Sequence, residues 1–348
     1  MIIIMKKNST TEQIKSISER LENLASKVHV IHKTKKIIVG AIKNSDGLEI
    51  MKLERLPGVE RITHTTKPFK LASREVQKTD TIINVKGISF GGENITIIAG
   101  PCAVESREQL LTAAHMVKKA GAQVLRGGAF KPRTSPYAFQ GLEEEGLKLL
   151  KEASQLTGLP TVTEVINERS LNMSMNYVDI LQIGARNMQN FQLLKMAGQS
   201  DKPILLKRGL SATIEEWLMS AEYIMAEGNN RVILCERGIR TFETYTRNTL
   251  DLSAVALVRQ LSHLPIIVDP SHSTGNTKLV QPMSLAALVG GANGLIIEMH
   301  PDPSAALCDG HQSLTPYEFN KLMRRIPKLL TVISDDLSVE EMEGAVNE

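Results

Sequence analysis

Over the first 66 residues, short apolar runs and amphipathic segments alternate in an order that predicts a small mixed α/β unit. Apolar runs and alternating patterns predict strands at 1–5, 28–32, 36–42 and 59–65. Apolar residues at helical spacing predict a helix after residue 9 and another over about 45–55. Ser9 and Glu12 form the S-x-x-E pattern of a helix start. The expected order is therefore βαββαβ.

This order within about 66 residues is typical of the ferredoxin-like split-βαβ unit, so residues 1–66 are expected to form one small domain. Residues 67–79 are basic, contain Pro68 and show no clean hydrophobic period. Segments of this kind often join domains. We interpret them as the linker to the rest of the chain.

From residue 80 onward, short apolar strands alternate with longer amphipathic helices, which is typical of a parallel sheet covered by helices. Eight such repeats occur, with strands ending near Ile98, Leu125, Val162, Ile183, Leu206, Leu234, Val268 and Ile297. Eight βα units in about 250 residues favour an α/β fold of the (β/α)8 TIM-barrel type over 80–333, rather than a doubly wound sheet. A hairpin over 82–90 is expected to close the lower end of the barrel. Residues 334–348 are expected to form an acidic tail.

The composition limits the class of protein. The 348 residues are 42% hydrophobic and 23% charged, which is ordinary for a packed globular chain. A formal charge of +3 is too even to predict a nucleic-acid or membrane partner. Neither a signal-peptide pattern nor an apolar run of roughly 20 residues is found in the sequence. Three cysteines do not fit a disulfide framework, so we expect a cytoplasmic protein.

In a TIM barrel the active site lies at the carboxyl ends of the strands, so polar residues there are candidates for chemistry. Cys102 follows the first barrel strand and His272 the seventh, whereas Glu298 ends the eighth and Asp309 lies in the loop beyond it. Barrel closure makes strand eight a neighbour of strand one, so these four side chains are expected to converge. Singly, each is more often a buried thiol, a surface imidazole or a solvated acid. Together they predict a site for one divalent metal ion such as Mn, Fe, Co or Zn.

A second set of strand-end residues is cationic. Its members are Arg126, Lys131, Arg133, Arg186, Lys207 and Arg237. A chain of nearly balanced charge that places so many cations at one mouth is expected to bind a ligand with more than one negative group, and phosphorylated substrates fit best.

Other polar residues near the strand ends are expected to have lesser roles. Surface ion pairs are expected for Arg208 and Arg240, spectator thiols for Cys235 and Cys308, and positions near the site without ligation for His300 and His311.

Seven ordered motifs carry a resemblance to a known family. They are A-G-P-C-A-V-E-S (99–106), G-G-A-F-K-P-R-T-S-P (127–136), Q-I-G-A-R-N-M-Q-N-F (182–191), L-K-R-G (206–209), C-E-R-G-I-R-T-F-E (235–243), D-P-S-H-S-T-G (269–275) and I-I-E-M-H-P-D-P-S-A-A-L-C-D-G-H-Q (296–312). These motifs resemble 3-deoxy-D-arabino-heptulosonate 7-phosphate (DAHP) synthase, in its smaller type I form with an N-terminal ferredoxin-like domain. The resemblance implies a metal-dependent transferase that condenses phosphoenolpyruvate with erythrose 4-phosphate as the first step of the shikimate pathway of aromatic amino acid biosynthesis.

The resemblance also implies roles for individual residues. Cys102, His272, Glu298 and Asp309 fall on the metal ligands of the family. Substrate contacts fall on Arg126, Lys131, Pro132, Arg133, Thr134, Ala185, Arg186, Lys207, Arg237 and Asp269, with 131–134 as the erythrose phosphate loop. Catalytic roles fall on Lys131, His272 and Glu164, and the group that activates the water is left open between Glu164 and a water bonded to Lys131 or His272.

Two rival functions remain at this point. A 3-deoxy-D-manno-octulosonate 8-phosphate synthase has a similar barrel but takes arabinose 5-phosphate, and the short 131–134 segment argues against it. A non-catalytic amino-acid sensor is the second rival, and the complete metal and cation sets argue against it. For residues 1–66 the resemblance implies a regulatory domain that binds tyrosine or phenylalanine, and for the whole chain a homotetramer.

Overall fold

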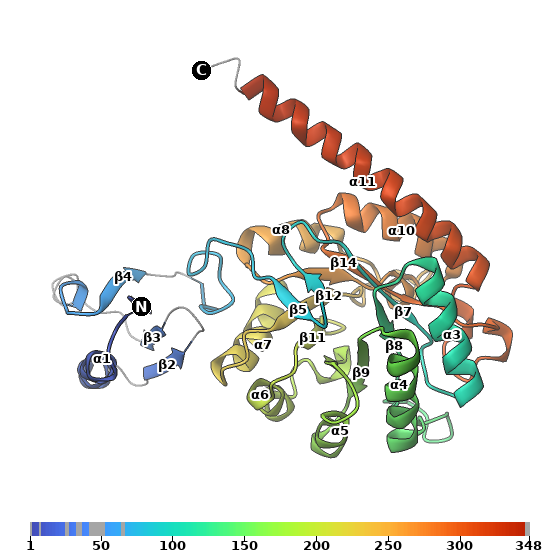
Figure 1. The fold of residues 1–348 in the computed structure, drawn as a ribbon, viewed down its shortest axis with the longest axis horizontal. Coiled ribbons are helices and arrows are strands. Elements are labelled where there is room, and N and C mark those ends of the chain that lie inside the picture. The colour runs from blue at the N-terminus through green and yellow to red at the C-terminus, as the bar shows by residue number, and fades with distance from the viewer. Residues whose placement is uncertain are drawn as a thin grey trace.

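The computed structural model describes residues 2–6, 8–24, 28–32, 37–41, 53–63 and 67–344. Figure 1 shows a small N-terminal domain at the left and a larger barrel at the right, joined by a single segment. This division follows the change of hydrophobic rhythm near residue 80.

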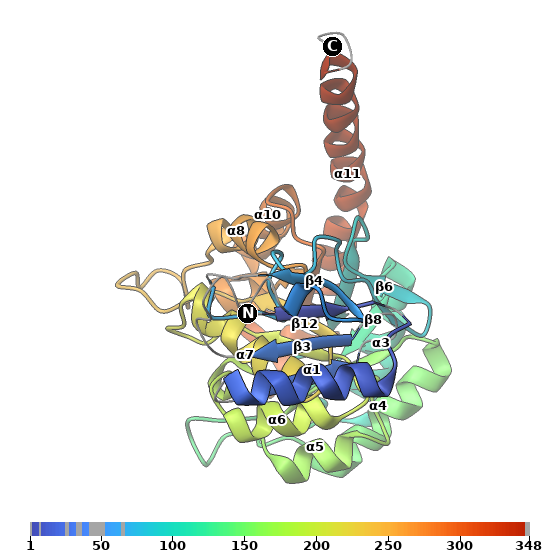
Figure 2. The same ribbon diagram turned by 90° about the vertical axis from the view of Figure 1, so that its left-hand side faces the viewer.

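The N-terminal domain is a four-stranded antiparallel sheet with a helix on one face. Its described elements are β1 (Ile2–Met5), α1 (Thr11–Leu24), β2 (Val28–His32), β3 (Ile37–Ala41) and β4 (Val59–Thr63). The strand order is β2-β3-β1-β4, and Figure 2 shows α1 running along the sheet. The expected ferredoxin-like domain is therefore confirmed. The helix expected over about 45–55 lies largely outside the described residues.

The start of α1 differs by one residue from the expected S-x-x-E pattern. The capping pair is Thr10 and Gln13, whose side chains each accept a hydrogen bond from the other's backbone N–H. Ser9 instead donates its hydroxyl to the carbonyls of Lys6 and Gly58. The prediction of Ser9 as the cap was wrong because this hydroxyl ties the chain before the helix to the turn before β4.

Eight parallel strands form a closed barrel, which confirms the predicted TIM fold. They are β7 (Thr96–Gly100), β8 (Val124–Arg126), β9 (Thr161–Val165), β10 (Ile180–Ile183), β11 (Ile204–Lys207), β12 (Val232–Glu236), β13 (Ile266–Val268) and β14 (Gly294–Glu298). β14 pairs with β7, so the first and last strands are neighbours.

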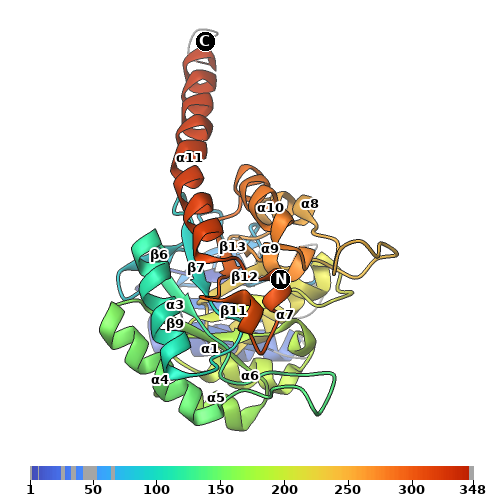
Figure 3. The ribbon, with the colours of Figure 1, turned by 90° about the vertical axis from the view of Figure 1, so that its right-hand side faces the viewer.

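Helices surround the barrel, as Figure 3 shows from the side opposite the N-terminal domain. They are α3 (Arg107–Ala120), α4 (Glu143–Thr157), α5 (Glu168–Ser174), α6 (Phe191–Gln199), α7 (Ile214–Ala226), α8 (Leu252–Leu261), α9 (Pro270–Thr274), α10 (Thr277–Val289) and α11 (Pro316–Gly344), with short 3-10 turns at Ala185–Asn187, Pro303–Ala305 and Gly310–Gln312. Alternate strand residues face these helices or the barrel interior, as the period of two requires.

The lower end of the barrel is closed by the expected hairpin, which consists of β5 (Ile83–Val85) and β6 (Ile88–Phe90). Phe90 is fully buried and belongs to the same apolar cluster as interior strand residues such as Ile98 and Ile233. The opposite end of the barrel is left for polar residues.

The linker segment binds the barrel through specific polar contacts. Backbone N–H groups of Leu71 and Ala72 donate to the carboxylate of Glu222 on α7, at 2.8 and 3.0 Å. The imidazole of His263 lies 2.7 Å from the carbonyl oxygen of Leu71. Phe69 is buried as well. From Phe69 onward, the linker therefore packs against the barrel.

Helix α11 continues without a break past residue 333, where the acidic tail was expected to begin, and projects away from the barrel in Figure 1. Within the described residues, no helix combines the length and apolar character needed to cross a membrane.

Candidate active site and metal cluster

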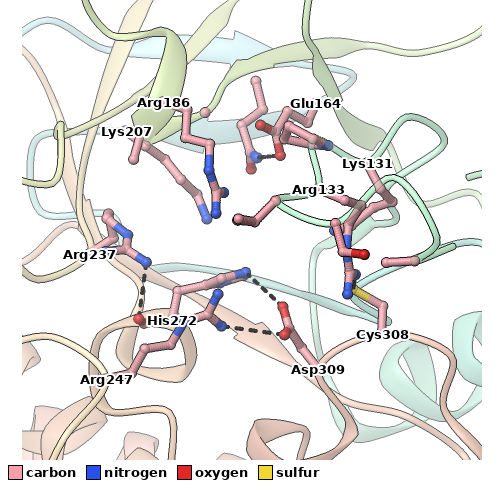
Figure 4. A pocket seen from close by; sticks show the side chains of 17 residues that line it. Lys131, Arg133, Glu164, Arg186, Lys207, Arg237, Arg247, His272, Cys308 and Asp309 are labelled. Atoms are coloured by element: carbon pink, nitrogen blue, oxygen red, sulfur yellow. Dashed lines mark hydrogen bonds and ion pairs between the residues drawn. The ribbon is translucent and has the colours of Figure 1, made fainter. Parts of the chain in front are cut away.

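A polar cavity of about 310 Å³ opens at the carboxyl ends of the barrel strands. Its lining contains most of the residues predicted to contact substrate or act in catalysis, together with the predicted metal ligand Asp309. The former are Lys131, Pro132, Arg133, Thr134, Glu164, Ala185, Arg186, Lys207, Arg237 and His272. In Figure 4 the labelled cations surround this space from several elements. An anionic ligand is therefore the chemistry that the cavity favours.

Four side chains at one edge of the cavity have the arrangement of a metal site. The ligand atoms of Cys102, His272, Glu298 and Asp309, here called the metal-ligand cluster, all lie within 4.8 Å of one another. Cys102 follows β7, His272 lies on α9 and Glu298 ends β14. The structure thus brings together the four residues that the sequence predicted.

His272 is oriented by Asp269. Its Nδ1 lies 2.8 Å from Asp269 Oδ2, and its Nε2 lies 3.2 Å from Glu298 Oε1, so Nε2 faces the cluster. Burial lowers the pKa of His272, although Asp269 and Glu298 partly oppose this effect. A neutral imidazole with Nδ1 held by a carboxylate is the form that ligates metals.

Both carboxylates of the cluster are held in their charged form. Burial raises the pKa of Glu298, but His272 and Arg126 more than offset it, so the net pKa is lowered. Burial likewise raises the pKa of Asp309, but His272 and Arg247 lower it by more, so the net pKa of Asp309 is also lowered. Among the described residues, no hydrogen-bond donor with good geometry reaches Glu298 Oε1, although Arg126 Nη1 lies 3.1 Å away.

One sulfur, one nitrogen and two oxygens fit a borderline divalent ion. This donor set suits Mn, Fe, Co or Zn better than Mg or Ca, which prefer oxygen alone. The buried Glu298 Oε1 accepts no hydrogen bond among the described residues, and a bound cation would supply the partner that this oxygen lacks. The residues therefore fit the metal that the sequence predicted.

Cys308 was expected to be a spectator thiol, but its sulfur lies 3.4 Å from Cys102 Sγ and lines the cavity. The hydrogen bond from Cys102, with help from Lys131, lowers the pKa of Cys308 to about 7. The same bond and burial raise the pKa of Cys102. The two thiols therefore titrate as a pair.

Lys131 joins the cavity to the metal-ligand cluster. Its buried Nζ lies 3.0 Å from Cys102 Sγ and 3.1 Å from the carbonyl oxygen of Cys102. Burial lowers the pKa of Lys131, but Cys102 and Cys308 raise it more, so the side chain stays charged. A Cβ on Gly128 would lie 2.9 Å from Lys131 Cδ, so a glycine is needed for this approach.

Glu164 lines the cavity near the end of β9, on the same side as Lys131 in Figure 4. Gln182 Nε2 donates to its Oε2 at 3.3 Å. A Cβ on Gly184 would lie 1.9 Å from Glu164 Oε1, so only glycine at that position leaves the carboxylate in place. Glu164 is therefore positioned facing the cavity, as its predicted role requires.

Two predicted substrate contacts lie behind the cavity wall. Arg126 is buried and forms an ion pair with Glu298, with 3.1 Å between Nη1 and Oε1. Asp269 is fully buried between His272 and Lys207, and its Oδ2 forms a short ion pair with the ammonium of Lys207. Neither side chain is among the residues that line the cavity.

Arg208 is buried rather than at the surface, where it was expected. Its Nη1 lies 2.9 Å from a carboxylate oxygen of Glu236 and 2.9 Å from one of Asp251. Two carboxylates neutralise the guanidinium, which makes its burial tolerable. The predicted ion-pair role is confirmed, and only its location was wrong.

Arg247 is a cavity residue that no sequence motif indicated. This side chain lines the cavity from the loop after β12, and its Nη1 lies 3.4 Å from Asp309 Oδ1. Ser135, Gln182 and Gly184 also line the cavity and were not singled out. These three residues lie within the motifs that carry the family resemblance, so the motifs could have identified them. Arg247 lies outside every one of those motifs.

Comparison with protein families gives two matches. The model of the DAHP synthetase I family matches residues 75–332, and the model of the DAHP synthase ferredoxin-like domain matches residues 1–67. Together these matches span the two domains seen in the structure.

Similar proteins are found at two levels of identity. Phospho-2-dehydro-3-deoxyheptonate aldolase of Thermotoga maritima is 50% identical over 329 residues, which cover 94% of this chain and 97% of that protein. A crystal structure of that DAHP synthase has a TM-score of 0.76 and 48% identity, and the match covers 95% of this chain and 97% of that one. The 2-dehydro-3-deoxyphosphooctonate aldolase of Syntrophotalea carbinolica is 30% identical over 270 residues, 72% of this chain and 96% of that protein.

Proposed function

Because the chain belongs to the DAHP synthetase I family and is a carbon–carbon bond-forming enzyme of the shikimate pathway, we propose that it joins phosphoenolpyruvate to erythrose 4-phosphate in the cavity described above. The products are DAHP and inorganic phosphate. The observation that carries the proposal is the metal-ligand cluster at the edge of a cavity lined by cations. The more distant octulosonate relatives give the rival reaction less support.

The cations of the cavity bind and orient the two anionic substrates. Arg186, Lys207 and Arg237 come from three adjacent strand ends and are assigned to phosphoenolpyruvate. Arg133 and Thr134, on the loop after β8, are assigned to the distal phosphate of the sugar. With these assignments, the enol carbon of one substrate would lie against the aldehyde carbon of the other.

The metal-ligand cluster would hold one divalent ion, which when bound polarises the aldehyde oxygen. Lys131 places a fixed positive charge beside it, where negative charge develops as the carbon–carbon bond forms. Water then adds to C2 of the former phosphoenolpyruvate, and the resulting phosphohemiketal loses phosphate. Of the two carboxylates lining the cavity, Glu164 is the one outside the cluster, and we assign it to hold that water.

Substrate choice is tested directly by phosphate release with four- and five-carbon sugar phosphates. We expect erythrose 4-phosphate to be used in preference to arabinose 5-phosphate, because the short 131–134 segment limits the depth of the distal phosphate. Arg133→Ala should raise the KM for erythrose 4-phosphate about 10- to 100-fold, which is the loss of one charged hydrogen bond, with a smaller change for phosphoenolpyruvate. Equal losses for both substrates would contradict the assignment, and a preference for arabinose 5-phosphate would overturn the function.

The affinity of the metal-free protein for a divalent metal ion should rise with pH, and the slope of this rise should change near pH 7. Below this pH both Cys102 and Cys308 carry protons, so binding releases one proton and affinity rises about tenfold per pH unit. Above it the pair holds one proton, on Cys102, and this proton passes to Cys308 when Cys102 binds the metal. No net proton is then released, so the rise levels off. In Cys308→Ser the rise should continue, since no second thiolate forms. Calorimetric titration with Mn²⁺ from pH 6 to 8.5 measures both slopes, and an unchanged break in the variant would refute this reasoning.

We propose that the ferredoxin-like domain regulates the barrel by binding tyrosine or phenylalanine. The match of residues 1–67 to the DAHP synthase ferredoxin-like domain supports this proposal. The alternative is a domain that only stabilises the assembly. We further propose a homotetramer, which light scattering would measure, and a cytoplasmic location consistent with three free cysteines in the described structure.

Removal of the domain should separate regulation from catalysis. A chain beginning at Lys67 keeps buried Phe69 and the contacts of Leu71 and Ala72 with Glu222, so its barrel should fold and retain most activity. It should lose inhibition by tyrosine and phenylalanine at millimolar concentrations. A full-length enzyme that ignores both amino acids, or a truncated one that is still inhibited, would disprove the regulatory role.

A further inference from the structure

The two carboxylates of the metal-ligand cluster are held by one pair of side chains, Arg247 and Gln312. Gln312 Nε2 donates to Glu298 Oε2 at 2.6 Å. Arg247 Nη1 lies 3.4 Å from Asp309 Oδ1. The other oxygens, Glu298 Oε1 and Asp309 Oδ2, lie 3.2 and 3.9 Å from His272 Nε2. Each carboxylate therefore has one oxygen tied to this pair and one oxygen directed to the cluster.

The orientation of the Gln312 amide depends on Arg247. Arg247 Nη1 donates to Gln312 Oε1 at 2.7 Å, and a guanidinium can only donate. The amide oxygen must therefore face Arg247, which directs the amide N–H toward Glu298. If the amide were inverted, its NH₂ group would face the guanidinium of Arg247, which is also a donor, and its oxygen would face the carboxylate of Glu298, which is also an acceptor. Because Gln312 is fully buried, solvent cannot compensate for such a mismatch.

Arg247 also lies at the boundary between this buried pair and the cavity. Its side chain is 35% exposed and lines the cavity, as Figure 4 shows beside Asp309. Its backbone N–H donates to the carbonyl of Thr274 at 3.0 Å. A Cβ on Gly275 would lie 2.6 Å from Arg247 Cβ, so the chain is closely packed at this point. Arg247 is thus fixed by its backbone while its guanidinium spans both environments.

We propose that Arg247 and Gln312 are positioning residues that hold Glu298 and Asp309 with one oxygen each toward the metal, and that they thereby set the affinity of the cluster for a divalent ion. The inference rests on the metal site of the proposed function. Groups that hold metal ligands typically contribute a factor of about 10 to 100 in metal affinity. The same guanidinium is open to an anion in the cavity, so the metal site and the substrate site share one side chain.

Mn²⁺ binding to the metal-free, full-length protein tests this role without reference to turnover. Gln312→Met keeps the length of the side chain but removes both hydrogen bonds, and Arg247→Met removes the guanidinium. Each should weaken Mn²⁺ binding about 10- to 100-fold. Arg247→Lys should recover part of the loss, since an ammonium can still donate to the amide oxygen. Arg240→Met, an exposed arginine of the same loop, is the matched control and should bind like the wild type.

The double variant decides whether the two residues act as one unit. Because Arg247 is proposed to act on Glu298 only through Gln312, the double variant should bind Mn²⁺ scarcely more weakly than the worse single variant. Fully additive losses, or single variants with wild-type affinity, would overturn the proposal. If Gln312→Met fails to fold, as its melting curve would show, the partly exposed Arg247 variants carry the test. Failure of the wild-type protein to bind one Mn²⁺ would instead overturn the proposed metal site itself.

Discussion

Cys102→Ala should lower kcat/KM about a thousandfold or more while leaving the protein folded, because Lewis-acid stabilisation is worth several kcal/mol and each 1.4 kcal/mol is tenfold. Cys102 is the only sulfur of the metal-ligand cluster, and the remaining three ligands would hold a borderline ion more weakly. Chelation of the wild-type enzyme should cause a comparable loss, which Mn²⁺ should reverse.

The matched control for this variant is Cys235→Ala. Cys235 on β12 is also fully buried, but it belongs to the apolar cluster inside the barrel and lies outside the metal-ligand cluster. Its loss should affect stability through a small cavity and leave metal binding unchanged. Comparable inactivation of both variants, or full activity of the metal-stripped enzyme, would show that Cys102 is not needed as a ligand.

The convergence of the metal-ligand cluster could be predicted because barrel closure fixes which strand ends are neighbours. Glu298 pairs in register with Gly100, two residues before Cys102, so the last and first strands deliver their polar residues to one point. Short apolar runs followed by polar residues marked those strand ends in the sequence. The apolar run that indicates a buried strand therefore also indicates where the polar residue after that strand will lie.

The contributions of two loop residues, Cys308 and Arg247, could not be predicted by the same reasoning. Cys308 and Arg247 lie on loops, where no hydrophobic period indicates the direction of a side chain. Asp309 adopts a left-handed backbone conformation with φ 51°, which turns the chain and brings Cys308 against Cys102. Such a turn depends on contacts between loops, so Cys308 appeared only as the neighbour of a ligand.

The start of α1 shows a second limit of sequence patterns. Residues 9–13 contain overlapping cap patterns, because either Ser9 or Thr10 could begin the helix. The choice is made by tertiary contacts, since the Ser9 hydroxyl reaches the carbonyl of Gly58, 49 residues away in sequence. A local pattern places the helix correctly, but the cap residue depends on what the competing hydroxyl binds.

Lys131→Met should lower kcat about 100- to 1000-fold even with the metal site saturated, which is the usual loss when one fixed donor to a developing charge is removed. The ammonium of Lys131 is buried at the contact between cavity and cluster, 3.0 Å from Cys102 Sγ, and the uncharged methionine side chain cannot supply its positive charge. Its absence should also weaken metal binding, because the Cys102 thiolate loses an adjacent positive charge.

Metal concentration separates these two effects of Lys131→Met. Excess Mn²⁺ restores occupancy of the cluster and should leave the loss in kcat, whereas recovery of full activity would mean that Lys131 acts only on metal affinity. Lys86→Met is the matched control. Lys86 lies in the turn of the β5–β6 hairpin at the other end of the barrel, where its exposed ammonium pairs with Asp179, 2.9 Å between Nζ and Oδ1. Exposed pairs contribute about 0–1 kcal/mol to stability, so this variant should keep wild-type kinetics. If kcat stays low in Lys131→Met at saturating Mn²⁺ but is unchanged in Lys86→Met, the positive charge of Lys131 acts in the chemical step.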